Sequence, residues 1–242
     1  MVFLVCGLDG DFNLRRLERY LALAAESRAS PVIVLHKADV ASDLSLRVEE
    51  TAAIAGTAPI VVSSAHDPGG LVGLMAFLAP GRTVALLGSS GVGKSTIANR
   101  LVGEQRLRTQ EVRLCDSRGR HTTTRRELIA LEQGGALIDT PGMRELQLWA
   151  GQESVDRTFE EIVAIAADCR YRDCSHSGER GCAVAAALAA GRIESERWES
   201  YRKLLAEAHR HELLADPLAA QEQKQKLKRM HKAIKRDYKF RW

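Results

Sequence analysis

The feature that most constrains the fold of this sequence is the string Gly88-Ser89-Ser90-Gly91-Val92-Gly93-Lys94-Ser95. It follows an apolar run and precedes a helical pattern that begins at Thr96, which is the context in which G-x-x-x-x-G-K-[ST] binds phosphates. The backbone N–H groups of such a loop surround phosphate oxygens together with the N-terminus of the next helix. We expect Lys94 to reach the terminal phosphates and the Ser95 hydroxyl to bind Mg²⁺. The predicted nucleotide site therefore runs from Gly88 to Thr96.

Apolar runs alternate with helix-like segments along the first 150 residues. Strands are predicted at residues 2–6, 31–35, 60–62 and 83–87. Helices are predicted between them, at residues 14–25, 44–55 and 71–78, and after them at 96–102. Two further β-type stretches, 127–132 and 136–138, flank Gln133-Gly134-Gly135 and predict a hairpin. The alternation predicts an α/β fold, with a parallel sheet covered by helices.

Beyond residue 149 the sequence becomes helical, Ala-rich and charged, with helices predicted at 155–167, 183–188 and 195–214. We therefore predict two domains, a nucleotide-binding domain over residues 1–150 and a small helical domain over residues 151–242. Lys and Arg dominate residues 224–241, which suits a polyanionic partner. The alternative is a solvated helix face. Because no apolar stretch is long enough for a membrane span and no signal peptide opens the chain, we predict a cytoplasmic protein without membrane attachment. A monomer is a separate expectation, on which the sequence itself is silent.

A second phosphate-sensing motif is predicted where an apolar strand ends at Asp139. Asp139-Thr140-Pro141-Gly142 fits the D-x-x-G pattern, in which the acid supports Mg²⁺ from behind its direct ligands and the Gly142 N–H senses the terminal phosphate. Between the two motifs lies a polar segment, residues 118–124, where we expect a switch carrying a magnesium-binding threonine. Which of the three threonines, 122–124, binds the metal stays open, and Thr123 is taken as a catalytic candidate. An ordinary surface loop is the alternative.

The base-binding motif is predicted before the phosphate loop, at His36-Lys37-Ala38-Asp39. Guanine selection requires a carboxylate that accepts from N1–H and the exocyclic amine, usually presented as N-K-x-D at a strand end. Asp39 fits that role, and the stem of Lys37 could lie over the base. A second base-contacting loop is predicted at Ser64 and Ala65. Because His36 replaces the usual asparagine, we predict weakened nucleotide affinity with guanine preference kept by Asp39.

The order of these motifs is a circular permutation. In an ordinary GTPase the phosphate loop comes first, whereas here residues 36–39 and 63–65 precede it. Permutation leaves the site intact because the strands can occupy the same places in the sheet. Many GTPases place a water-orienting glutamine after the D-x-x-G turn, but this chain has Met143 there. We therefore expect low intrinsic turnover and assign the water-orienting role to His121 of the switch.

Three of the five cysteines lie close together with a histidine. The cluster consists of Cys169, Cys174, His176 and Cys182. In a cytosolic protein three thiolates and an imidazole indicate a metal site before disulfides, and this closed set of four fits structural zinc. Four unliganded side chains are the alternative. Cys6 and Cys115 lie outside the cluster and are expected to be ordinary buried or loop cysteines.

Together these features resemble the RsgA-type family of ribosome small subunit-dependent GTPases. The resemblance rests on the permuted motif order, residues 119–124, residues 139–142 and the spacing of the cysteine–histidine cluster, and it covers nearly the whole chain. It implies a GTPase of late small (30S) subunit maturation that contacts ribosomal RNA, turns over faster on the ribosome, and uses GTP/GDP, Mg²⁺ and one structural Zn²⁺. Members usually begin with an RNA-binding OB-fold domain, whereas this sequence opens on the first GTPase strand, so we expect that domain to be either missing or cut off.

Two other functions are compatible with parts of the sequence. A P-loop ATPase would share the phosphate loop but has no use for Asp39. A zinc-stabilised RNA- or ribosome-binding module could use nucleotide as a clamp with little hydrolysis, as His36 and Met143 suggest. Against the clamp stand Lys94, Ser95 and Asp139, which a structural domain would not need.

Overall fold

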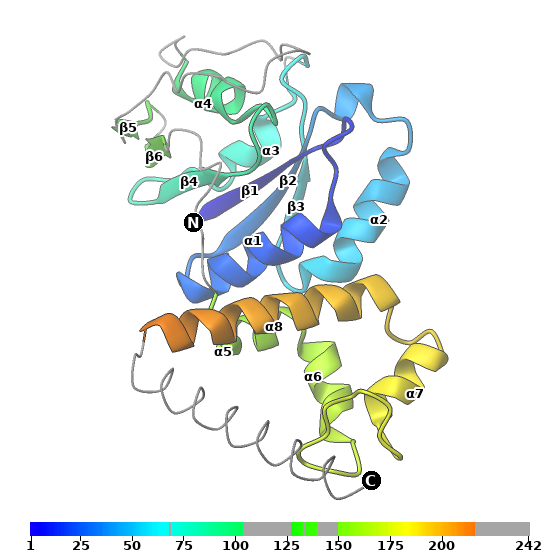
Figure 1. Ribbon diagram of the computed structural model, residues 1–242. Helices are drawn as coiled ribbons and strands as arrows, with labels where there is room; N and C mark the ends of the chain where they lie inside the picture. Colours follow the sequence, from blue (N-terminus) through cyan, green and yellow to red (C-terminus); the bar gives the residue numbers. More distant parts are fainter. Residues whose placement is uncertain (68, 104–126, 133, 140–149, 216–242) are drawn as a thin grey trace, which may run out of the picture.

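The computed structural model describes residues 1–67, 69–103, 127–132, 134–139 and 150–215. Within these residues six strands form one sheet (Figure 1). The strands are β1 (Val2–Gly7), β2 (Pro31–His36), β3 (Ile60–Val62), β4 (Thr83–Leu87), β5 (Glu127–Ala130) and β6 (Ala136–Asp139). They lie in the order β3-β2-β1-β4-β6-β5, and only β5 runs antiparallel to its neighbour. The α/β prediction and the predicted hairpin are thus confirmed.

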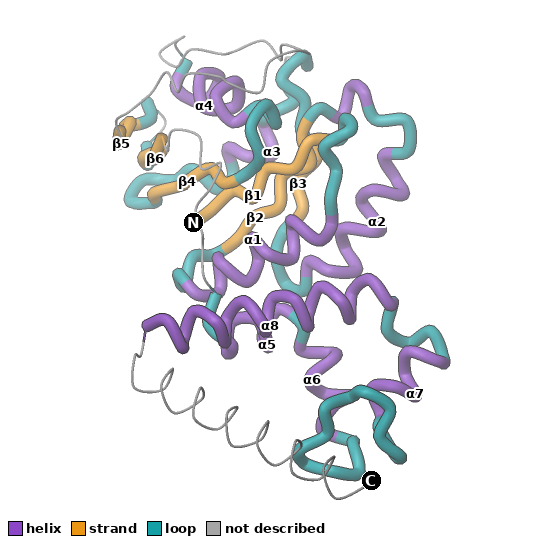
Figure 2. Tube along the Cα trace, viewed as in Figure 1, coloured by secondary structure: helices purple, strands orange, loops and turns teal. Residues whose placement is uncertain are grey.

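Alternation along the buried strands sends side chains into two separate cores. In β1, Leu4 and Cys6 point to one face and Phe3 and Val5 to the other, since successive side chains of a strand alternate. Helices α1 (Leu14–Glu26) and α2 (Leu44–Ala55) cover the first face. Helices α3 (Val72–Met75) and α4 (Lys94–Val102) cover the second, and Figure 2 shows the sheet between these two helical layers.

The strand order reverses between β1 and β4. The chain passes from β1 through α1, β2 and α2 to β3 at one edge, and returns through α3 to place β4 on the other side of β1. Ligands of open α/β sheets bind outside the carboxyl ends of the strands at such a switch point. The loops that follow β1, β2 and β4 therefore border the expected ligand position.

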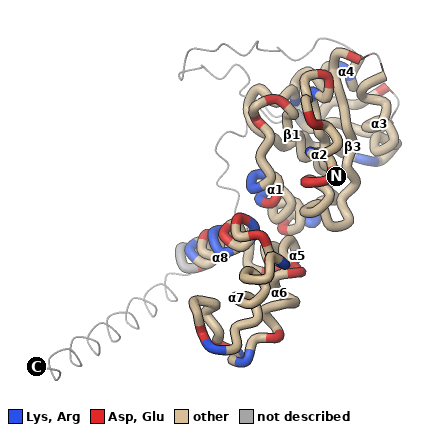
Figure 3. The backbone as a smooth tube through the Cα atoms, turned by 90° about the vertical axis from the view of Figure 1, so that its right-hand side faces the viewer, with Lys and Arg blue, Asp and Glu red and all other residues tan. Residues whose placement is uncertain are grey.

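Four further helices pack below the sheet, α5 (Gln152–Thr158), α6 (Glu160–Ala167), α7 (Ala183–Ala189) and α8 (Ser195–Ala215). Their core is built around Val155, Phe159 and Ile162, and it also receives Ala22 of α1, which is fully buried. Figure 3 shows α8 at the junction with the sheet domain, carrying charges of both signs. Among the described helices none has both the length and the apolar character needed to cross a membrane.

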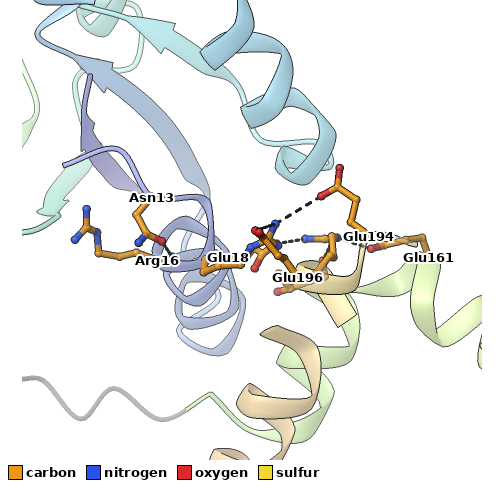
Figure 4. A network of polar contacts seen from close by, with 9 residues as sticks. Asn13, Arg16, Glu18, Glu161, Glu194 and Glu196 are labelled. Carbon is orange, nitrogen blue, oxygen red and sulfur yellow. Dashed lines mark hydrogen bonds and ion pairs between the residues drawn. The ribbon is translucent and has the colours of Figure 1, made fainter. Parts of the chain in front are cut away.

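The junction contains a buried ionic network that joins α1 to α6 and α8 (Figure 4). Glu18 of α1 is fully buried, and its Oε1 accepts hydrogen bonds from Arg15 and, at 2.7 Å, from Arg197 of α8. Arg197 also donates to Glu161 at 2.6 Å and lies over the Phe159 ring at 4.5 Å. Glu18 Oε2 is the one buried side-chain oxygen or nitrogen of the described residues that has no hydrogen-bond partner.

Two predicted helices were wrong in extent. The segment predicted as a helix over 71–78 is helical only over Val72–Met75, and Phe77 and Leu78 continue it with bonds to the carbonyls three residues earlier. This tighter winding keeps Leu71, Leu74 and Leu78 in the same core. The segment predicted as one helix over 155–167 is two, because the chain bends at Phe159 (φ −121°, ψ 39°) to bury that ring.

Candidate functional site

The phosphate loop connects β4 to α4, and its glycines are required by its shape. Gly91 and Gly93 have φ of 80° and 102°, in the left-handed region that side chains disfavour. At Gly88 a methyl group would lie 2.5 Å from the Val5 carbonyl oxygen of the neighbouring strand. The loop thus lies tightly on the sheet edge, with the N-terminus of α4 directed at the predicted phosphate position.

The Lys94 side chain folds back onto the phosphate loop that precedes it. Its ammonium donates to the Gly88 carbonyl at 2.7 Å and to the Ser89 carbonyl at 2.5 Å. Ser95 and Thr96 follow it in the first turn of α4, both half-buried. A lysine held above phosphate-binding N–H groups supplies the positive charge that a terminal phosphate requires.

The base motif lies directly against the phosphate loop, although 54 residues separate Lys37 from Gly91. His36 ends β2 and is buried, with Nδ1 2.9 Å from the Ser63 hydroxyl oxygen. A methyl group at Gly93 would lie 2.5 Å from His36 Cδ2, so the imidazole packs on the phosphate loop. Burial, assisted by the Lys37 cation, lowers the pKa of His36 to about 4, and the ring is neutral at pH 7.

Asp39 projects from the short helix η1 (Ala38–Val40) beyond β2 and is exposed. Its Oδ1 accepts a hydrogen bond of 2.6 Å from the Ser64 hydroxyl, which lowers the pKa of the carboxyl group. The Ala38 N–H donates to the Ser63 carbonyl at 3.1 Å, so the loop that holds Ser64 and Ala65 is tied to the base motif. The two predicted base-contacting segments are therefore neighbours, and the Asp39 carboxylate remains accessible.

Sequence reasoning missed a third segment of this site, the loop between β1 and α1. Asp9 accepts a hydrogen bond of 2.5 Å from Lys37 Nζ, and Asp11 accepts one from the Ser89 hydroxyl. The position of this loop could have indicated its role, because it follows a strand beside the switch point, where ligands of such sheets bind. Acidic residues in a turn match no sequence motif.

The cysteine–histidine cluster lies in the C-terminal helical region, between α6 and α7. All four predicted ligand atoms lie within 4.8 Å of one another. Cys169 Sγ and Cys182 Sγ are each 3.5 Å from His176 Nδ1. A tetrahedral zinc with usual bond lengths separates sulfur and nitrogen ligands by about 3.6 Å, so the arrangement fits this metal.

Backbone groups and a ring orient the cluster. The N–H groups of Ala183 and Ala185 point at Cys169 Sγ and Cys182 Sγ, both at 3.3 Å, and such bonds stabilise thiolates. The His176 ring meets Trp198 of α8 edge-on at 5.6 Å. Cys6, by contrast, is buried in β1 far along the chain from this group.

Several predicted residues lie outside the described part of the chain. These are His121, Thr123, Gly142 and Met143, together with Cys115 and the basic segment 224–241. Asp139 is placed at the end of β6, beside β4, without a described side chain. The switch and the D-x-x-G turn therefore stay predictions.

Comparison with known proteins gives three results. The sequence profile of the RsgA GTPase family matches residues 1–149. The small ribosomal subunit biogenesis GTPase RsgA of Opitutus terrae is 51% identical over 231 residues, covering 95% of this chain and 63% of that protein. A crystal structure of YjeQ from Thermotoga maritima matches with a TM-score of 0.63 at 30% identity, over 86% of this chain and 70% of that one.

The permuted fold also has a solved counterpart. The structure of YloQ, described as a circularly permuted GTPase, matches with a TM-score of 0.61 at 23% identity, over 87% of this chain and 68% of that one. The chain spans about three-fifths of the length of the first curated relatives it matches.

Proposed function

The chain belongs to the RsgA GTPase family, and from this we propose that it hydrolyses GTP to GDP and phosphate during maturation of the small ribosomal subunit. The observation that carries the proposal is the contact between the base motif and the phosphate loop at the switch point. His36 packs on Gly93, and Lys37 donates to the Gly91 carbonyl at 2.8 Å. The ribosomal partner and the cytoplasmic location are proposed from the names of the relatives.

The proposed roles follow the chemistry of each side chain. Asp39 selects guanine, the N–H groups of residues 88–96 hold the phosphates, and Lys94 stabilises charge on the terminal phosphate. Ser95 would ligate Mg²⁺, with Asp139 supporting it from the end of β6. Bound Mg²⁺ neutralises negative charge on the phosphates. His121 is proposed to orient the attacking water, Thr123 is a further catalytic candidate, and one threonine of residues 122–124 is proposed to join the Mg²⁺ ligands.

We also propose that the cysteine–histidine cluster holds one structural zinc. The donor set, the 3.5 Å contacts and the N–H groups directed at two sulfurs support this assignment. With all four positions taken by protein ligands, the metal would stabilise the helical domain and leave the chemistry to the sheet edge.

Turnover on the ribosome tests the main proposal. Phosphate release from GTP is measured with and without purified small ribosomal subunits, with Lys94→Ala as the blank. Stimulated release that the variant lacks is the expected result. GTP binding without stimulation would remove the ribosome-activated role, and absence of binding would remove the nucleotide site itself.

Base selection is tested separately by Asp39→Asn. The variant loses the second carboxylate oxygen that accepts from guanine, and its amide matches the carbonyl that xanthine carries in place of the exocyclic amine. We expect preference to shift from GTP toward xanthosine triphosphate in competition binding. A variant that still prefers GTP would contradict the assignment of Asp39.

A further inference from the structure

The β1–α1 loop, residues 8–13, contacts both the base motif and the phosphate loop. β1 and β4 pair in parallel, so the loops that follow them flank the same crevice. The loop carries two carboxylates, Asp9 and Asp11. Unpaired negative charge beside a phosphate site would repel nucleotide, so the partners of these carboxylates decide what the loop does.

Asp9 holds a lysine of the base motif. Lys37 Nζ donates to Asp9 Oδ2 at 2.5 Å and to the Gly91 carbonyl at 2.8 Å, so the ammonium bridges the two loops. Asp9 Oδ1 meanwhile accepts from the Asp11 N–H at 3.3 Å. A methyl group at Gly7 would lie 2.6 Å from this oxygen, so glycine provides the space into which the carboxylate folds.

The surroundings favour the ionised form of the Asp9 carboxyl group. Burial alone would raise the pKa of Asp9, but hydrogen bonding and attraction from Lys37 outweigh it and lower the pKa. The Lys37 backbone is left-handed (φ 62°), an uncommon conformation for a side chain other than glycine. Two contacts and an unusual backbone therefore direct one long, otherwise mobile side chain across the phosphate loop.

We propose that Asp9 is a positioning residue for guanine nucleotide, which fixes Lys37 across the phosphate loop so that the lysine stem forms a ready-made wall of the base pocket. The inference rests on the proposed function, because its ligand is a guanine nucleotide. Ordering a lysine side chain costs conformational entropy, and an ion pair that orders it beforehand removes that cost from binding. Asp9 itself touches no part of the nucleotide in this scheme.

The test is a double-mutant cycle with fluorescent mant-GDP as the probe. Asp9→Asn can keep the acceptor for the Asp11 N–H while losing the carboxylate oxygen that binds Lys37. Asp9→Ala loses both, and Lys37→Met removes the ammonium while keeping the stem. Glu50→Gln is the matched control, because this carboxylate has a similar exposure and pairs with Arg47 at 2.9 Å on α2.

We expect Asp9→Asn to weaken mant-GDP binding roughly fivefold, as loss of one partly exposed ion pair does, with an unchanged melting temperature. Asp9→Ala should weaken mant-GDP binding by the same factor, and Glu50→Gln should bind mant-GDP like wild type. In the Lys37→Met background, Asp9→Asn should cause no further loss of affinity. Three outcomes would overturn the inference: wild-type affinity in Asp9→Asn, a loss in Asp9→Ala alone, or an equal loss with and without Lys37. Failure of the wild-type protein to bind mant-GDP would instead overturn the proposed function.

Discussion

The nucleotide site at the carboxyl ends of the strands and the cysteine–histidine cluster show two different ways of holding a binding site. In the nucleotide site, polar groups form hydrogen bonds with one another. Lys94 donates to loop carbonyls, Lys37 donates to Asp9, and the Ser64 hydroxyl donates to Asp39. In the cluster, three sulfurs and a ring nitrogen face one another with few other partners. The first site is shaped by the fold around it, whereas the second is expected to depend on its metal for its shape. Variants at each site should therefore fail differently.

The largest effect is expected from Cys182→Ser in the cluster. Structural zinc supplies much of the folding energy of small metal domains, so losing a ligand should cost about 5 kcal/mol or more of local stability. Zinc content measured by elemental analysis should fall, and hydrogen exchange in α6 and α7 should accelerate while β1 and β2 stay protected. Cys6→Ala is the control and should leave zinc content unchanged. Full zinc in Cys182→Ser would contradict the ligand assignment.

Arg197→Ala tests the junction between the two regions. It leaves the buried Glu18 with only Arg15 as a side-chain partner, and breaking a buried ion pair costs about 3 kcal/mol of unfolding free energy. Urea unfolding measures the change. The exposed pair Arg157–Glu153 supplies the control, since Arg157→Ala should change stability by less than about 0.5 kcal/mol. Equal losses in the two variants would show that burial of the network contributes nothing.

Lys94→Ala should weaken nucleotide binding without lowering the stability of the fold. The lysine donates to two carbonyls of the phosphate loop, and losing a charged hydrogen bond to phosphate costs about 2–3 kcal/mol, or roughly 100-fold in affinity. The melting temperature without nucleotide should stay near that of wild type. Lys203→Ala, which removes an exposed lysine of α8, is the matched control. A large loss of stability in Lys94→Ala would mean that the loop is part of the folding core.

The smallest effect, counted per pH unit, concerns His36. Its pKa is lowered to about 4 by burial, while the unfolded residue titrates near 6.5. Unfolding therefore takes up a proton between these values, and the free energy of unfolding should fall as pH drops through this window, by at most about 1.4 kcal/mol per pH unit. His36→Asn should remove that part of the slope in urea unfolding at pH 4.5–7. Identical slopes would show that His36 titrates normally.

Much of the sheet could be predicted because apolar strands end sharply at glycines and polar turns. The meeting of the base motif and the phosphate loop also follows from sequence, since the carboxyl ends of parallel strands share one edge. The Asp9–Lys37 and Asp11–Ser89 contacts could not be found this way. They join positions 28 and 78 residues apart, and neither acid belongs to a motif.

Tertiary packing also overrode a sequence pattern in the helical region. Residues 155–167 have helical spacing throughout, but burying Phe159 beneath Arg197 interrupts the helix. The buried ionic network at Glu18 could not be predicted from the sequence either, because charged residues on a helix normally indicate a face exposed to solvent. The predicted boundary near residue 151 stays a prediction.

Helix α1 belongs to both halves of the molecule. Leu17 and Leu21 complete the core beneath the sheet, while Ala22 completes the core of α5–α8 and Arg19 pairs with Glu207 of α8. Cutting the chain at residue 150 would therefore remove α1 from the core of the second half. In the first half it would expose the face of α1 that packs on α5–α8. The two pieces, made as separate polypeptides, should recognise each other along α1 and reassemble, as complementing fragments do when they share a core.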